Sequence, residues 1–134
     1  MEHNGVKKLK VLYVEDDPDV RFATSQILKL LGYNVECANN GKLGVEKALT
    51  WQPDIILMDV RMPVMSGPKA IRILRDHPDT ALTPILVLTA HADAKTRSEC
   101  KKAGADKIFQ KVADADRLDT VIKYTYKQKT CNGN

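Results

Sequence analysis

The chain lacks long hydrophobic runs, an export signal and closely spaced cysteines. Its densest apolar runs, residues 55–58 and 85–88, are far shorter than the ~18 residues that span a bilayer. Residues 1–10 are polar and charged, which indicates no signal peptide and a cytoplasmic protein without a membrane segment. The three cysteines stand at wide spacings without a CxxC pair, so we expect reduced thiols rather than a zinc site or disulfides.

Aromatic residues are scarce, at 5% of the chain, and no run of lysine or arginine exceeds two residues. The formal net charge is +4, but the positive residues are scattered along the sequence. Surfaces that bind nucleic acid combine clustered cations with stacking aromatics or a recognisable motif. We therefore expect a solvated surface that makes no direct contact with nucleic acid.

What the 134 residues do contain is an ordinary apolar share, 43%, which is enough for the core of one domain. Short β-branched runs alternate with segments of helical spacing. The expected strands are residues 10–14, 34–38, 54–58, 84–89 and 107–110. The expected helices are residues 18–31, 41–50, 68–77, 94–103 and 116–127. The buried face expected for the first helix consists of Val20, Ala23, Ile27, Leu30 and Leu31.

This alternation predicts an α/β fold in which parallel strands carry helices on both faces. The third and fourth strands, DIILMD and PILVLT, are apolar between their ends, as strands buried on both faces should be. At this size we expect a flavodoxin-like (βα)5 three-layer sandwich whose five-stranded parallel sheet has the order 2-1-3-4-5. Sites in such sheets lie beyond the carboxyl ends of the strands where the order reverses, here between the first and third strands.

Polar and charged side chains mark the carboxyl ends of four of these strands. Glu15 and Asp16 follow the first strand, and Asp59 follows the third. Thr89 ends the fourth strand, and Lys111 follows the fifth. Because parallel strands end at the same edge of a sheet, we expect these five side chains to lie close together.

The acidic members of this set predict a metal site. Each pair of carboxylates ~4 Å apart repels by about 4 kcal/mol at an effective dielectric of ~20, unless a cation lies among them. Oxygen ligands suit Mg²⁺. The expected ligands are Glu15, Asp16, Asp59 and the backbone carbonyl of Arg61. With charge neutralised by the cation and by Lys111, Asp59 is the candidate nucleophile toward a phosphoryl group, and Thr89 is the hydrogen-bond donor to it.

Four stretches, VLYVEDDPDVR, DIILMDVRMPVMSG, ILVLTA and AGADKIFQK, occur in an order and spacing typical of one family. From residue 9 to residue 127 the chain resembles the receiver domain of two-component response regulators, in particular the single-domain regulators of the chemotaxis type. The resemblance implies Mg²⁺-dependent transfer of a phosphoryl group from a histidine kinase or histidine phosphotransfer protein to Asp59. It assigns metal binding to Glu15 and Asp16, the switch hydroxyl to Thr89 and phosphate binding to Lys111. The protein would be a signalling switch rather than a turnover enzyme.

The resemblance also implies a partner-binding face that changes on phosphorylation. This face consists of residues 84–89, 94–103, 107–110 and 116–127. Its partner would be a downstream protein, a missing output domain or a second copy of the chain in a homodimer. The expected switch region comprises Thr89, Ile108 and Phe109. Residues 1–8 and 128–134 are expected to be mobile ends outside the receiver domain.

The chain departs from the family pattern near the lysine. Three residues before it, where the family usually has an aromatic that moves with the threonine, stands Ile108, and Phe109 follows on the other face of the strand. The usual proline after the lysine is Val112, and we expect a trans peptide bond because a cis bond before a non-proline residue costs roughly 3–4 kcal/mol. Arg61 and His91, each two residues past a site residue, are expected to influence the lifetime of the phosphoryl group.

Three other functions are left open by the residues. A flavin-binding electron carrier of similar topology would need phosphate-binding donors in its first loop, where this chain is acidic. A hydrolase with an aspartyl-phosphate intermediate often has a second acid two residues after the nucleophile, where this chain has Arg61. A phosphorylation-independent pseudo-receiver that only binds proteins is favoured by Ile108 and Val112, and is disfavoured by the complete set of acidic, hydroxyl and lysine residues.

Overall fold

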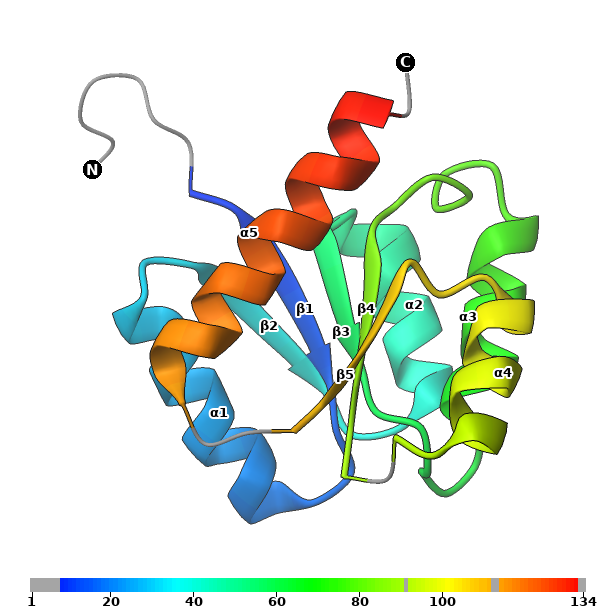
Figure 1. Ribbon diagram of the computed structural model, residues 1–134, viewed down its shortest axis with the longest axis horizontal. Helices are drawn as coiled ribbons and strands as arrows, with labels where there is room; N and C mark the ends of the chain where they lie inside the picture. The colour runs from blue at the N-terminus through cyan, green and yellow to red at the C-terminus, as the bar shows by residue number, and fades with distance from the viewer. Residues whose placement is uncertain (1–7, 91, 112–113, 133–134) are drawn as a thin grey trace.

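Strands and helices alternate along the whole of the described chain (Figure 1). The computed structural model describes residues 8–90, 92–111 and 114–132. The predictions for His91 and for the peptide bond between Lys111 and Val112 fall outside these ranges. The strands are β1 (Lys10–Val14), β2 (Asn34–Ala38), β3 (Ile55–Met58), β4 (Ile85–Thr89) and β5 (Lys107–Gln110). The helices are α1 (Pro18–Leu30), α2 (Gly41–Trp51), α3 (Gly67–Asp76), α4 (Ala94–Ala103) and α5 (Ala115–Asn132).

The five strands are parallel and pair in the order β2-β1-β3-β4-β5, which confirms the predicted flavodoxin-like topology. The register places Val14 of β1 opposite Met58 of β3. Just past this pair, the backbone N–H of Asp59 donates to the carbonyl oxygen of Val14 over 3.1 Å. The loops that follow β1 and β3 therefore leave the sheet next to each other, at its lower edge in Figure 1.

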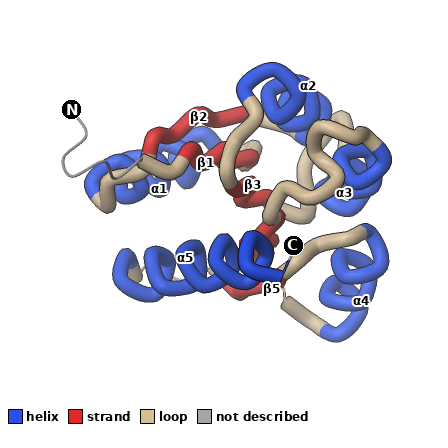
Figure 2. The backbone as a smooth tube through the Cα atoms, turned by 90° about the horizontal axis from the view of Figure 1, so that it is seen from above, coloured by secondary structure: helices blue, strands red, loops and turns tan. Residues whose placement is uncertain are grey.

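Helices cover both faces of the sheet, and an apolar core lies on each face (Figure 2). Helices α1 and α5 lie on one side, and α2, α3 and α4 lie on the other. Alternate residues of β1 enter different cores, since Leu12 and Val14 pack on the α2–α4 side while Val11 and Tyr13 pack on the α1–α5 side. All four residues of β3 are buried, which explains why this segment is a continuous apolar run.

Short polar side chains begin four of the helices by accepting backbone N–H bonds. These capping residues, for α1 to α4 in turn, are Asp17, Asn40, Ser66 and Asp93. The Asp17 carboxylate accepts from the N–H groups of Asp19 and Val20 at 2.9 and 3.2 Å. Because Asp17 caps α1, the preceding carboxylate of Asp16 is not used for that purpose.

The buried face of α1 differs from the predicted one. Its buried residues are Ser25 and Leu28, whereas Leu30 is 88% exposed. Ser25 is small, and its hydroxyl donates to the carbonyl oxygen of Phe22 over 2.8 Å, so its polar group is satisfied inside the helix–sheet contact. The prediction was therefore wrong about the centre of this face. It left out Ser25 because Ser25 is polar, and it also left out the apolar Leu28, although the predicted Ile27 and Leu31 do pack there, partly buried.

Helix α5 continues to Asn132, whereas the sequence predicted its end at residue 127 and a mobile tail beyond. Residues 115–132 contain no glycine or proline, so no residue of this segment interrupts the helix. In the added turn, Lys129 pairs with Asp106, whose Oδ1 lies 2.9 Å from the ammonium nitrogen. This ion pair anchors the end of α5 to the loop before β5. Among the described residues, no helix is both long enough and apolar enough to cross a membrane.

Candidate functional site

Three carboxylates converge beyond the carboxyl ends of β1 and β3. Glu15 and Asp16 follow β1, and Asp59 follows β3 on the neighbouring strand. Each offers a carboxylate oxygen that lies within 4.8 Å of the other two. Glu15 is 2% exposed, and Asp16 and Asp59 are half-buried. The structure thus brings together the three predicted acidic residues in a set of oxygen atoms that suits a hard divalent cation.

Lys111 reaches this cluster from the end of β5. Its backbone N–H donates to the carbonyl oxygen of Thr89 over 2.8 Å, which keeps the chain paired with β4 just past the strand. Its ammonium forms an ion pair with Glu15 and lies 3.7 Å from Oδ2 of Asp59. One cation therefore faces three carboxylates, and the pocket carries a net negative charge.

Glu15 accepts hydrogen bonds from three donors although its side chain is almost completely buried. Lys111 and the Tyr13 hydroxyl, the latter at 3.2 Å, both donate to Oε1, and the N–H of Asp17 donates to Oε2 over 3.1 Å. Burial by itself raises the pKa of Glu15, but these hydrogen bonds and the charge of Lys111 outweigh it, and the pKa is lowered. Burial also raises the pKa of Tyr13, which stays protonated. Glu15 is therefore an ionised carboxylate at neutral pH.

Asp59 has the opposite electrostatic character. Burial raises its pKa to about 6; Lys111 opposes this, and the charges of Glu15 and Asp16 add to it. The backbone N–H of Val60 donates to Oδ1 over 2.8 Å and lowers the pKa only in part. A cation bound beside Asp59 strongly stabilises its ionised form, because the cation removes the repulsion from the neighbouring carboxylates that favours the protonated form.

Arg21 holds the loop that carries the acidic pair. From α1, its guanidinium donates to the backbone carbonyl oxygens of Glu15 and Asp16 at 2.9 and 3.3 Å. No role was predicted for this residue from the sequence. The sequence feature that could have predicted this role is the position of an arginine in the first turns of the helix that directly follows the acidic residues.

Gly67 packs directly against the backbone of Asp59. A Cβ atom at this position would lie 2.2 Å from the Asp59 carbonyl oxygen and 3.0 Å from the Cα of Val60. The Gly67 N–H donates to the carbonyl oxygen of Val60 over 2.8 Å and closes the loop between β3 and α3. Only glycine permits this approach, so Gly67 sets the backbone position of Asp59, a role that was not predicted from the sequence.

The other predicted residues lie in β4, in β5 and in the loop after β3. Thr89 ends β4, the neighbour of β3, and is 3% exposed. Ile108 belongs to the core on the α2–α4 side and Phe109 packs on the α1–α5 side, so they lie on opposite faces of β5, as predicted. Arg61 is exposed in the loop after β3, and it lines a surface pocket with residues of α3 and α4.

Comparisons of the sequence with known proteins identify a family. The sequence model of the response regulator receiver domain matches residues 11–123. The chain is 35% identical over 114 residues to the regulatory protein AtoC of Escherichia coli, covering 85% of this chain and 24% of AtoC. It is 34% identical over 121 residues to a cyclic di-GMP phosphodiesterase of Thermotoga maritima, covering 90% of this chain and 32% of that protein. The chain thus spans about a quarter to a third of the length of these curated relatives.

Solved structures of the same fold include one with a metal ion. The chemotaxis protein CheY4 of Vibrio cholerae superposes with a TM-score of 0.84 at 32% identity, over 89% of this chain and 99% of that chain. The receiver domain of sensor histidine kinase PA1611 from Pseudomonas aeruginosa has a TM-score of 0.84 at 31% identity, over 90% of this chain and 98% of that chain. That structure has a magnesium ion coordinated in its active-site cleft.

Receiver domains are signalling switches of two-component systems, and they interact with histidine kinases and output domains. They bind Mg²⁺ in an acidic pocket, and this chain has an acidic cluster of Glu15, Asp16 and Asp59 beyond β1 and β3. The family match covers most of the chain, and the fold agrees with it. The chain belongs to the response regulator receiver domain family of two-component signalling.

Proposed function

We propose that this chain accepts a phosphoryl group on Asp59 in a Mg²⁺-dependent reaction and transmits the signal through a change in a partner-binding face. The proposal rests on one pocket. Glu15, Asp16 and Asp59 place carboxylate oxygens there within 4.8 Å of one another. The Lys111 ammonium lies 3.7 Å from Oδ2 of Asp59 in the same pocket. The donor is a histidine kinase or a histidine phosphotransfer protein, in keeping with the partners of the family.

The residues that would hold Mg²⁺ are Glu15, Asp16, Asp59 and the backbone carbonyl of Arg61. The donor set consists of oxygen atoms, which fits a hard cation. The pKa of Asp59 is raised first by burial and also by the charges of Glu15 and Asp16, so a bound cation would favour its ionised form. When bound, Mg²⁺ supplies positive charge beside the transferring phosphoryl group.

In the transfer step, a carboxylate oxygen of Asp59 forms a bond to phosphorus while the bond from phosphorus to the donor's imidazole nitrogen breaks. The electron pair of the breaking bond leaves with the nitrogen, and the product is an acyl phosphate on Asp59. Lys111 neutralises one oxygen of the phosphoryl group, and the Thr89 hydroxyl donates to another. Asp59 reacts as a carboxylate, so no proton has to be removed from it.

The proposed output is a change in the face formed by β4, α4, β5 and α5. Thr89 ends β4 and Lys111 follows β5, so both proposed phosphoryl contacts belong to this face. Arg97 of α4 donates to the carbonyl oxygen of Ile108 over 3.3 Å, which links α4 to the backbone of β5. Because Ile108 replaces an aromatic, we expect switching to depend on Thr89 and the backbone of β5, with Phe109 on the opposite side. The partner is a downstream protein, an output domain or a second copy of the chain.

Intact mass after treatment with acetyl phosphate and Mg²⁺ tests the proposal. We expect the parent protein to gain the mass of one phosphoryl group, and we expect this gain to be lost with a chelator and in Asp59→Asn. Asp79→Asn changes an exposed aspartate and should be phosphorylated like the parent. Hydroxylamine should release the group, since it cleaves acyl phosphates and leaves phosphate esters intact. No gain in a folded parent protein that binds Mg²⁺ would favour a phosphorylation-independent protein-binding module.

A further inference from the structure

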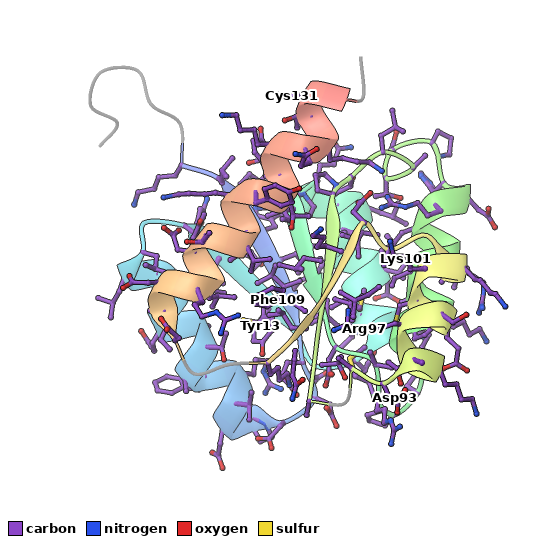
Figure 3. All side chains as sticks on the ribbon, in the orientation of Figure 1. Tyr13, Asp93, Arg97, Lys101, Phe109 and Cys131 are labelled. Atoms are coloured by element: carbon purple, nitrogen blue, oxygen red, sulfur yellow. The ribbon has the colours of Figure 1, made fainter. Side chains whose placement is uncertain are left out.

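Tyr13 contacts the buried carboxylate of Glu15 from the interior of the fold. Tyr13 packs in the core on the α1–α5 side of the sheet, and Glu15 follows two residues later, just past the end of β1. Tyr13 is 1% exposed, and its hydroxyl donates to Oε1 of Glu15 over 3.2 Å. Figure 3 shows Tyr13 near Phe109 on the side of α5, and the two residues line a common cavity of about 300 Å³.

The oxygen that accepts from Tyr13 also accepts from Lys111, while Oε2 accepts the N–H of Asp17. The two side-chain donors to Oε1 differ in their freedom to move. Tyr13 is enclosed in a core, whereas Lys111 has a flexible stem, is 26% exposed, and lies 3.7 Å from Oδ2 of Asp59. One donor is therefore fixed on Glu15, and the other can turn to Asp59.

This sharing becomes important when Lys111 binds a phosphoryl group on Asp59. Its ammonium then turns away from Glu15, and Oε1 loses its ion pair. Glu15 is 2% exposed, so water does not readily replace the lost donor, and a buried carboxylate oxygen that loses a donor is costly. Among the side chains that the structure describes, Tyr13 is the donor that remains on this oxygen.

We propose that Tyr13 is a positioning residue that keeps the Glu15 carboxylate oriented toward the bound cation while Lys111 transfers from Glu15 to the phosphoryl group. The inference rests on the proposed function and adds to it a residue that does not touch the reacting atoms. Carboxylates at metal sites depend on such outer hydrogen-bond donors, and their loss typically costs about 10-fold or more in metal affinity or activity.

The variant Tyr13→Phe isolates the hydroxyl, because the ring can still pack in the core that contains Leu88 and Leu118. Amide NMR titrations measure its affinity for Mg²⁺ alone, and its affinity for the phosphoryl analogue beryllofluoride at saturating Mg²⁺. We expect beryllofluoride binding to weaken about 10-fold and Mg²⁺ binding to weaken less, since Lys111 still pairs with Glu15 until the analogue arrives. Circular dichroism and thermal unfolding check that the variant is folded.

The matched control is Tyr33→Phe. Tyr33 is also buried, and its hydroxyl also donates to a carboxylate, Oδ1 of Asp119, over 2.5 Å. It directly precedes β2, at the end of the sheet opposite to the acidic cluster. Tyr33→Phe should therefore leave both affinities within about twofold of the parent values.

A double-mutant cycle with Glu15→Asp tests whether Tyr13 acts through Glu15. The shorter side chain withdraws the carboxylate from the phenol, so Tyr13→Phe should cause no further loss in this background. Three results would overturn the inference and leave the proposed function in place: an undiminished effect in Glu15→Asp, parent-like beryllofluoride binding in Tyr13→Phe, or equal weakening of both affinities. A folded parent protein that binds neither Mg²⁺ nor beryllofluoride would overturn the proposed function and this inference together.

Discussion

Lys111 forms ion pairs with two carboxylates, a hydrogen-bonded one with Glu15 and a longer one with Asp59, whose Oδ2 lies 3.7 Å from its ammonium. The pair with Glu15 joins the ends of β1 and β5 across 96 residues of sequence. Because Glu15 is 2% exposed, Lys111 neutralises a charge that is almost completely shielded from water. In the proposed reaction the same ammonium is needed at the phosphoryl group, so one side chain serves both the stability of the pocket and its chemistry.

Replacing Lys111 with methionine should destabilise the protein at neutral pH. The buried Glu15 carboxylate loses its ion pair, and we expect the free energy of unfolding to fall by about 2 kcal/mol. Added Mg²⁺ should restore part of this loss, because the bound cation takes over the role of the ammonium. Urea unfolding with chelator and with Mg²⁺ measures both effects. Lys102→Met, at an exposed position of α4, should stay within about 0.5 kcal/mol of the parent. An equal loss with and without Mg²⁺ would contradict this account.

The stability of the metal-free protein should depend on the charge of Asp59. Its pKa is raised by burial from 3.8 to about 6, so between these values the folded state binds a proton that the unfolded chain does not. Protonated Asp59 contributes to the free energy of unfolding at low pH, and this contribution is lost as the pH rises through about 6. Asp59→Asn should therefore raise the free energy of unfolding by about 1–3 kcal/mol at pH ~7 and by much less at pH ~4. Urea unfolding of both proteins in chelator gives the difference, and a variant that is no more stable at neutral pH would refute the argument.

Gly67→Ala should disturb the backbone at Asp59. The added Cβ would lie 2.2 Å from the Asp59 carbonyl oxygen, so the loop must shift, at a cost of roughly 3 kcal/mol in the free energy of unfolding. We also expect slower phosphorylation by acetyl phosphate, because the carboxylate moves with its backbone.

The control variant is Gly32→Ala. At Gly32 φ is +100°, but an added Cβ meets nothing within 4 Å. It should cost about 1 kcal/mol from backbone strain alone and leave the phosphorylation rate unchanged. Parent-like stability and rate in Gly67→Ala would show that the loop adapts freely.

Arg75→Lys should destabilise the fold and leave the site intact. The Arg75 guanidinium donates to the carbonyl oxygens of Thr83 and Gly104 at 2.7 and 2.9 Å and forms an ion pair with Asp106 at 2.8 Å. Lysine cannot reproduce this planar set of donors, and we expect a loss of about 2–4 kcal/mol. Thermal and urea unfolding measure the loss.

The contacts of Arg75 lie before β4 and β5, at the end of the sheet opposite to Asp59, so the phosphorylation rate of the folded variant should equal that of the parent. Arg72→Lys, at an exposed position of the same helix, is the control and should change stability by less than about 0.5 kcal/mol. A folded Arg75→Lys variant with a much lower rate would mean that this end of the sheet is coupled to the site.

Strands and topology could be predicted from the sequence because their signals are local. The continuous apolar run at β3 indicates burial on both faces, and the alternation of strands and helices leaves few ways to connect a parallel sheet. The buried face of α1 and the end of α5 were predicted less well. Ser25 can be buried because its hydroxyl bonds to its own helix, and the last turn of α5 is held by a contact from Lys129 to Asp106. Neither contact is visible in hydrophobic periodicity.

The amino-acid sequence specifies which chemical groups arrive at the site, since parallel strands end at a common edge and each strand places its next residues there. Which of these groups bond to one another depends on how the strands and helices pack. Lys111 pairs with Glu15, Tyr13 shares the same oxygen, and Arg21 holds the acidic loop. Such pairings require side chains from separate strands and helices to lie within a few ångströms of one another. The packing of the whole fold sets these distances.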